Sequence, residues 1–221
     1  MAMAQSDIFV REVRISGNRV LCIMVYHDSQ LRDIKSFCFD ARRGSVLSFD
    51  KKFNLGSMYV TVSTYRHQAL NRPTTGSSPN FFEPMFIHRQ SDTDTYSYFL
   101  GRIASKFQDM DFQQLHLGLD DEFATRKSLA FCFRGAALLD CTQHLQQNTE
   151  HSARDSVGLS SSQSHHFVHA IFGDAGLTSC SDVASFDSAV DRFRSSLLAD
   201  APDQLREYFN NRYYIHSVQQ I

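Results

Sequence analysis

SVLSFDKKFNLGSMYVTVSTYRH, residues 45–67, is the stretch that decides the fold. A short apolar run leads to Gly56-Ser57, and the run that follows is rich in β-branched and aromatic residues, which favour strands. The stretch therefore predicts a β-hairpin with its turn at Gly56-Ser57. Asp50 falls inside the first strand, where an aspartate is disfavoured and costly to bury unpaired. Its presence is explained either structurally, by a bulge or an ion pair with Lys51 or Lys52, or as a ligand of a hard cation.

The segments on either side of the hairpin predict a mixed sheet with helices. Residues 7–26 predict two short strands joined at Gly17-Asn18, and residues 28–38 have helical spacing with Asp28 or Ser29 as the cap. After a loop over residues 68–84, strands and helices alternate: a strand at 85–88, a helix at 92–107, a strand at 115–119, a helix at 120–133, a strand at 137–141 and a helix from 142. This order predicts an α/β fold whose later strands are parallel and whose helices cover the sheet.

The remainder of the chain predicts helices. Residues 150–164 are polar and Ser-rich, which is typical of an exposed loop. Helices are expected beyond it at 166–172, 186–198 and 204–214.

Composition narrows the class of protein. The 42% hydrophobic and 21% charged residues are ordinary for a globular protein, and the length suits one fair-sized domain or a domain with an extension. A net charge of −2 provides no overall attraction to nucleic acid or membrane. The longest strongly apolar run, residues 20–26, is too short to cross a bilayer, and no signal peptide is visible. The five scattered cysteines are typical of reduced thiols in an intracellular protein.

Side chains able to perform chemistry follow two of the expected strands. Asp120 ends the strand at 115–119, and Cys141-Thr142-Gln143-His144 ends the next one. In open α/β sheets, sites lie at the carboxyl ends of strands. Asp50 and Asp120 on neighbouring strands could hold divalent cations, and a pair of such ions aligns a nucleophile and stabilises the leaving oxygen in phosphoryl transfer.

Each of these features also has a structural explanation. Asp120-Asp121-Glu122 could be an acidic helix start that interacts with the helix dipole. Cys141 could be a core thiol and His144 a surface or capping residue. A third interpretation is a zinc-stabilised interaction module, because Cys141 and His144 have ligand-like spacing and further zinc-binding types lie downstream, at His165, His166, His169 and Cys180.

In their order along the chain, SVLSFDKKFNLG, YVTVSTYRH, LHLGLDDEFA and LLDCTQH resemble the catalytic domain of Mutator-like element transposases. The segment VYHDSQLRDIKSFC also looks like the part of such transposon-derived proteins that precedes this domain. The resemblance covers roughly residues 7–145 well and the remainder weakly. It implies a ribonuclease-H-like domain over residues 45–221, with residues 1–44 as a small N-terminal β/α extension.

The resemblance also implies an activity. Proteins of this family cleave DNA and transfer strands with a DDE-type site that holds Mg²⁺ or Mn²⁺. The expected partners are DNA, as transposon ends and target, and further copies of the chain in a homo-oligomer. The expected location is the nucleus, with no membrane association.

By matching positions, the resemblance makes Asp50 the first metal ligand and Asp120 the second. Cys141 and His144 match the C-x-x-H motif of the family, a structural or DNA-positioning element. The third acid is expected just before Phe186, where this chain has Ser185. The nearby acids that could replace it are Asp182 and Asp187.

Several positions depart from the family pattern. Lys52 stands where the family has Thr, and Leu119 and Asp121 replace the Thr and Gly around the second aspartate. No DNA-binding zinc domain is recognisable, and the chain stops soon after the last catalytic-type helix. These departures support an alternative, in which the chain is a fragment or an inactive, domesticated copy that binds DNA or protein without catalysis.

Overall fold

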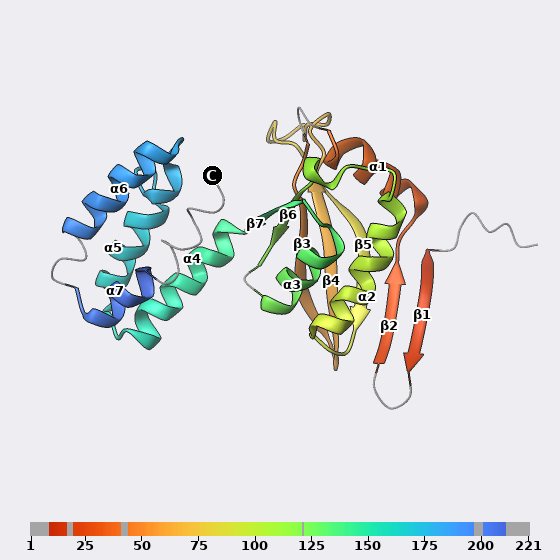
Figure 1. The fold of residues 1–221 in the computed structure, drawn as a ribbon, viewed down its shortest axis with the longest axis horizontal. Coiled ribbons are helices and arrows are strands. Elements are labelled where there is room, and N and C mark those ends of the chain that lie inside the picture. The colour runs from red at the N-terminus through yellow and green to blue at the C-terminus, as the bar shows by residue number, and fades with distance from the viewer. Residues whose placement is uncertain (1–8, 17–19, 41–43, 121, 197–200, 211–221) are drawn as a thin grey trace, which may run out of the picture. The chain divides into compact units, whose positions relative to one another are not determined.

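The computed structural model describes residues 9–16, 20–40, 44–120, 122–196 and 201–210, without the side chains of residues 16, 20 and 52–54. The chain divides into two compact units, Met1–Asp140 and Cys141–Ile221, and each is described by itself (Figure 1). The expected turn at Gly17-Asn18 lies outside the described residues.

The described residues of the first unit form a seven-stranded mixed sheet. Its strands are β1 (Val10–Ser16), β2 (Val20–Val25), β3 (Leu47–Leu55), β4 (Met58–Arg66), β5 (Asn80–His88), β6 (His116–Leu119) and β7 (Ala137–Asp140). The spatial order is β1-β2-β5-β4-β3-β6-β7, so the strands of residues 1–44 join the same sheet as the hairpin. The β3–β6 and β6–β7 pairs are parallel and the others are antiparallel. The α/β class expected from the sequence is confirmed.

The helices of this unit connect its strands, and the helix over residues 123–132 supplies the crossover between the parallel strands β6 and β7. They are α1 (Asp28–Cys38), α2 (Thr93–Ala104) and α3 (Phe123–Cys132), with short 3₁₀ turns η2 (Ser105–Phe107) and η3 (Phe112–Gln114). Buried side chains of all three helices and of one face of the sheet form a single core, and Figure 1 shows the helices against the strands. Stacking of Phe86 on Phe99, with ring centroids 4.6 Å apart, joins β5 to α2 in this core.

The β-hairpin predicted over residues 45–67 is confirmed. Strands β3 and β4 pair antiparallel around Gly56, whose φ of +65° is a backbone conformation that side chains with a Cβ rarely adopt. The register shifts between Lys51 and Phe53, so a bulge follows Asp50 closely. A β-bulge was one of the two structural explanations considered for the aspartate.

Some boundaries differ from the sequence predictions. Helix α1 spans the predicted residues, but its cap is His27, whose side chain accepts from Ser29 N–H while Gln30 reaches back to the His27 backbone. Strand β5 begins at Asn80, inside the predicted loop, because its first residues pair with the end of β4. The helix expected at 92–107 ends as α2 at Ala104 and continues as the η2 turn.

The described residues of the second unit are helical. The elements are α4 (Thr142–His151), the π-helical turn η4 (Ser152–Ser156), α5 (Ser161–Phe172), the 3₁₀ turn η5 (Leu177–Ser179), α6 (Val183–Ser196) and α7 (Asp203–Phe209). They enclose a core of their own around Phe167, Phe193 and Phe209. The prediction of one loop over 150–164 was wrong. Helix α4 and the turn η4 continue to Ser156, and α5 begins after Ser160, whose side chain accepts from the Gln163 backbone N–H while the Gln163 side chain accepts from the Ser160 backbone. Only residues 157–160 connect η4 to α5.

A buried carboxyl group lies under α1. Glu83 of β5 is 1% exposed, and its Oε2 has no hydrogen-bond partner among the described residues. Burial, with a smaller contribution from the charge of Asp33, raises the pKa of Glu83 to about 8. Glu83 is therefore protonated in the folded protein at neutral pH.

This carboxyl group predicts a pH-dependent stability. Between pH 4.5 and about 8 the folded protein holds a proton that the unfolded chain releases, so stability should fall as pH rises through this window. The loss is at most about 5 kcal/mol. We expect Glu83→Gln to flatten this part of the profile in urea unfolding measured from pH 4 to pH 9.

The exposed Glu150→Gln is the matched control and should keep the wild-type profile. A Glu83→Gln protein that loses stability with pH as steeply as wild type would contradict the assignment to Glu83.

Candidate active site

The parallel pairing of β3 with β6 brings the two predicted metal ligands to neighbouring positions. Leu47, Ser48 and Phe49 pair in register with Leu117, Gly118 and Leu119. The next residues along the two chains are Asp50 and Asp120. Paired strands lie about 4.8 Å apart, and each aspartate directly follows the last paired residue of its chain segment. The sheet therefore pairs the strand that holds Asp50 with the strand that directly precedes Asp120.

The close approach of β3 and β6 depends on a glycine. A Cβ added at Gly118 would lie 2.6 Å from Ser48 Oγ and 3.0 Å from Val46 Cγ1. Both distances are shorter than ordinary van der Waals contact. A side chain at position 118 would therefore clash with Ser48 of β3. Gly118 lies two residues before Asp120, and Ser48 lies two residues before Asp50.

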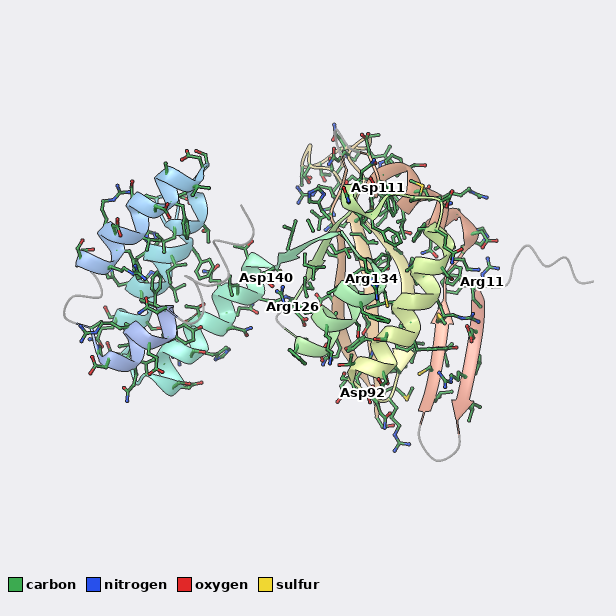
Figure 2. The ribbon with its side chains drawn as sticks, in the orientation of Figure 1. Arg11, Asp92, Asp111, Arg126, Arg134 and Asp140 are labelled. Atoms are coloured by element: carbon green, nitrogen blue, oxygen red, sulfur yellow. The ribbon has the colours of Figure 1, made fainter. Side chains whose placement is uncertain are left out.

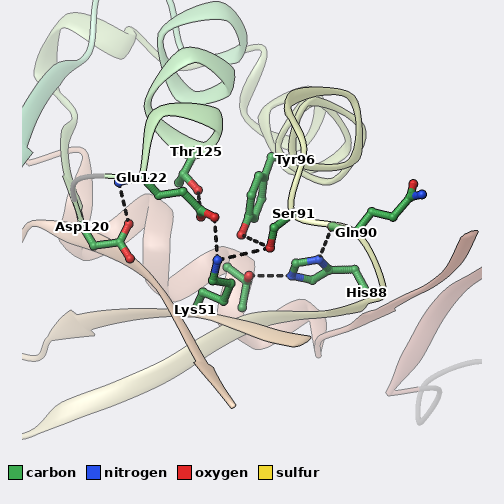
Figure 3. Close-up of polar contacts among 9 residues, drawn as sticks. Lys51, His88, Gln90, Ser91, Tyr96, Asp120, Glu122 and Thr125 are labelled. Atoms are coloured by element: carbon green, nitrogen blue, oxygen red, sulfur yellow. Dashed lines mark hydrogen bonds and ion pairs between the residues drawn. The ribbon is translucent and has the colours of Figure 1, made fainter. Parts of the chain in front are cut away.

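The two aspartates have different surroundings. Asp50 is half-buried in β3 and lies opposite Val62 of β4. Asp120 is the first residue after β6, and its Oδ1 accepts a hydrogen bond of 3.3 Å from the backbone N–H of Glu122 (Figure 3). This bond fixes the Asp120 carboxylate to the chain that leads into α3.

A polar network beside Asp120 was not found from the sequence. Lys51 Nζ lies 2.6 Å from Glu122 Oε1 and donates to Ser91 Oγ at 3.2 Å. Thr125 Oγ1 donates to the other oxygen, Glu122 Oε2, at 2.7 Å. Figure 3 shows these contacts converging from β3, the segment before α2 and the start of α3. The network ties the strand that carries Asp50 to the loop that carries Asp120.

The charges of this network stabilise each other. Burial alone would raise the pKa of Glu122, but hydrogen bonds from Lys51, Thr125 and Tyr96 bring it below its usual range. Burial alone would lower the pKa of Lys51, but the bond to Glu122 and the charges of Glu122 and Asp120 raise it. Both groups are therefore charged at neutral pH, and Asp120 is close enough to act on Lys51 electrostatically.

A fully buried histidine borders the network. His88 Nδ1 lies 2.7 Å from the carbonyl oxygen of Gln90, and Nε2 lies 2.8 Å from Thr61 Oγ1. Since a carbonyl only accepts, Nδ1 carries the proton and Nε2 accepts from the Thr61 hydroxyl. Burial lowers the pKa of His88, so the ring is neutral. With both nitrogens satisfied, His88 supports the packing between β5 and α2.

Two structural explanations of the acidic positions can be compared with the contacts of the described residues. Lys51, one of the two lysines considered as partners of Asp50, forms its ion pair with Glu122. Glu122 occupies the cap position of α3 but makes no side-chain capping bond, because its carboxylate is held by Lys51 and Thr125. Asp121 lies outside the described residues.

The other predicted site residues belong to the second unit. Asp182 is exposed, and its Oδ1 accepts from Ser185 N–H at 2.8 Å at the start of α6. Asp187 is exposed on α6. Cys141 precedes α4 as its cap residue, and in that helix His144 Nδ1 is buried without a hydrogen-bond partner in the described part of the chain.

The residues of the zinc interpretation can also be placed. His165, His166 and His169 are exposed on α5, and the rings of His165 and His169 are 6.3 Å apart. Cys180 is a free, half-buried thiol. Within the described ranges, no three side chains of His, Cys, Asp or Glu are grouped so that they could hold a metal ion.

Two further observations bear on the class of protein. In the part of the chain that the structure describes, no helix combines the length and the apolar character needed to cross a membrane. Comparison with models of known protein families and with curated proteins finds no match.

A substitution at Gly118 tests the close approach of the two strands. We expect Gly118→Ala to destabilise the protein by roughly 1–3 kcal/mol, because its methyl group would overlap Ser48 and Val46. Chemical unfolding measures this loss.

Gly101→Ala is the matched control, since a Cβ there would meet only Cys132 Sγ at 3.8 Å. A Gly118→Ala protein as stable as the Gly101→Ala protein would show that β3 and β6 do not require a glycine.

Proposed function

We propose that this chain is derived from a DDE-type transposase and that its first unit is a metal-dependent nuclease core of the ribonuclease-H-like class. The sheet supports this fold class. Strands β5-β4-β3 form an antiparallel meander, and β6 and β7 extend it in parallel beside β3. A ribonuclease-H-like sheet has this strand order, with carboxylates on its first and fourth strands, which correspond to β3 and β6.

The observation that carries the proposal is the register of the β3–β6 pair, because Asp50 and Asp120 directly follow the paired residues Phe49 and Leu119. Two carboxylates separated by one strand spacing can share a hard divalent cation, and Mg²⁺ uses few protein carboxylates with the rest of its sphere left to water and phosphate oxygens. The donor chemistry therefore fits Mg²⁺ or Mn²⁺. A bound pair of such ions would activate water or a DNA 3′-hydroxyl for in-line attack on a phosphodiester.

The chain's own residues would have distinct parts in this function. Asp50 and Asp120 would hold the cations, and Glu122 N–H would orient the Asp120 carboxylate through its hydrogen bond. The third acid implied by the resemblance, Asp182 or Asp187, belongs to the second unit, so the proposal depends on the Asp50–Asp120 pair alone. Action on transposon ends and target DNA would place the chain, as a homo-oligomer, in the nucleus.

One observation favours a second candidate, a domesticated copy that binds DNA or protein without catalysis. Ser185 stands at the position expected for the third acid, and it bonds reciprocally with Asp182. Asp182 Oδ1 accepts from Ser185 N–H, and Ser185 Oγ accepts from Asp182 N–H at 3.3 Å. This arrangement is a capping box for α6, so both residues have a structural role.

A metal titration tests the carboxylate pair. We expect Mg²⁺ or Mn²⁺ to raise the melting temperature of the wild-type chain, because a ligand that binds only the folded state stabilises it by RT ln(1 + [L]/Kd). At one hundred times Kd this amounts to about 2.7 kcal/mol. Asp50→Asn and Asp120→Asn should each abolish most of the shift.

Asp94→Asn, at an exposed position in the first turn of α2, is the matched control and should respond to metal as wild type does. Equal shifts in all four proteins, or none in any, would exclude a shared cation site at Asp50 and Asp120. If the site binds metal, cleavage of a DNA substrate by the full chain separates the active from the domesticated alternative.

A further inference from the structure

Strand β1 forms one edge of the sheet. In the part of the chain that the structure describes, it pairs with β2 on one side and with no strand on the other (Figure 1). An edge strand presents backbone N–H and C=O groups to its outer side, where a further strand can pair. The seven residues Val10–Ser16 contain no proline that would block such pairing. The edge is therefore able to accept another strand.

The two faces of β1 carry different side chains. Glu12 and Arg14 lie on the side of α2, where both contact Tyr98. Glu12 accepts from the Tyr98 hydroxyl, and the Arg14 guanidinium lies 4.6 Å from the centroid of the Tyr98 ring. Since successive side chains of a strand alternate, Val13 and Ile15 lie on the opposite face. They are 54% and 75% exposed, so the edge presents apolar surface as well as charge.

An apolar row crosses the sheet on this opposite face and ends at the edge. Val13 pairs with Ile23 of β2, and Ile23 pairs with Ile87 of β5. Ile87 pairs in turn with Val60 of β4. The inner three side chains are half-buried, whereas Val13 is more than half exposed. A strand added beside β1 with an apolar residue opposite Val13 would continue this row and cover its exposed end.

The β1 sequence is complementary to itself in one antiparallel register. When two identical strands pair around a twofold axis, one residue lies opposite itself and its two neighbours lie opposite each other. An axis at Val13 places Glu12 of each copy opposite Arg14 of the other, and all seven residues of the strand then find a partner. An axis at Glu12 or at Arg14 would place two like charges opposite each other, which is destabilising. The charges therefore favour a second copy of this chain, paired around Val13.

We propose that β1 is a dimerisation edge, to which a second copy of this chain adds its own β1 in antiparallel orientation with the twofold axis at Val13. The two sheets join into one continuous sheet. Backbone hydrogen bonds, two Glu12–Arg14 pairs and the contact between the two Val13 side chains hold it together. The inference goes beyond the proposed function, which includes a homo-oligomer without its surface, and it requires neither metal nor DNA.

Sedimentation velocity of the full chain without added metal tests the proposal. We expect the mass of the wild-type protein to approach twice the 25.2 kDa of one chain as concentration rises. Arg14→Glu makes both charged positions acidic, and Glu12→Arg makes both basic. Each variant alone should dimerise about tenfold more weakly than wild type, because like charges then face each other. An equal mixture of the two variants restores opposite charges at both positions and should dimerise nearly as tightly as wild type.

The recovery in the mixture distinguishes pairing between copies from a loss of structure within one copy. Variants that remain monomeric after mixing would overturn the register. Val13→Lys tests the axis without touching the contacts to α2, and it should also weaken the dimer by about tenfold, since it places two ammonium groups against each other.

Leu55→Lys is the matched control, because Leu55 is a similarly exposed apolar residue, at 64%, on another strand. It should dimerise as wild type does. A wild-type chain that is monomeric at every concentration, or a Val13→Lys chain that dimerises as tightly as wild type, would overturn the proposal. Neither result bears on the metal titration of Asp50 and Asp120, so the two proposals fail separately.

Discussion

The parallel pairing of β3 with β6 is the constraint on which the candidate site depends. Parallel strands cannot be joined by a tight turn, so their alignment must be imposed by packing. Leu47 and Phe49 of β3 and Leu117 and Leu119 of β6 are all buried in the same core. A shift of either strand by one residue would turn these side chains out of the core, so the hydrophobic pattern fixes the register. Because the register is fixed, Asp50 and Asp120 become neighbours.

Polar contacts between the strands and helix α3 stabilise the same alignment. Lys51 and Glu122 link β3 to the start of α3, and Arg126 of α3 forms an ion pair with Asp140 at the end of β7 (Figure 2). Ion pairs that are partly buried are costly to break from one side, because the remaining charge loses its partner. Strands β3 and β7 are thereby held to helix α3 both by packing in the core and by ion pairs at the border of the core.

Much of the fold could be predicted from the sequence because its signals are local. The hairpin follows from the β-branched run and Gly56, and α2 follows from the spacing of Tyr96, Phe99 and Leu100, all of which are buried. The parallel order of the later strands follows from their alternation with helices. The 150–164 segment was missed because a Ser-rich composition can start a helix through its capping residues as readily as it can form a loop.

The candidate site was predictable only in part. Asp50 could be identified because it lies within a strand whose sequence pattern is clear. Asp120 could be identified because it directly follows such a strand. The Lys51–Glu122 pair could not, since its partners are 71 residues apart and meet only through the β3–β6 register. Buried Glu83 was also missed, because a single acidic residue in a loop-like, Pro-containing segment gives no local sign of burial.

The central claim is that Asp50 and Asp120 share one divalent cation. Anomalous diffraction from crystals of the full chain grown with Mn²⁺ tests it most directly. We expect a manganese peak bonded to carboxylate oxygens of both Asp50 and Asp120. A peak elsewhere, with Asp50 and Asp120 bonded to protein groups alone, would contradict the claim.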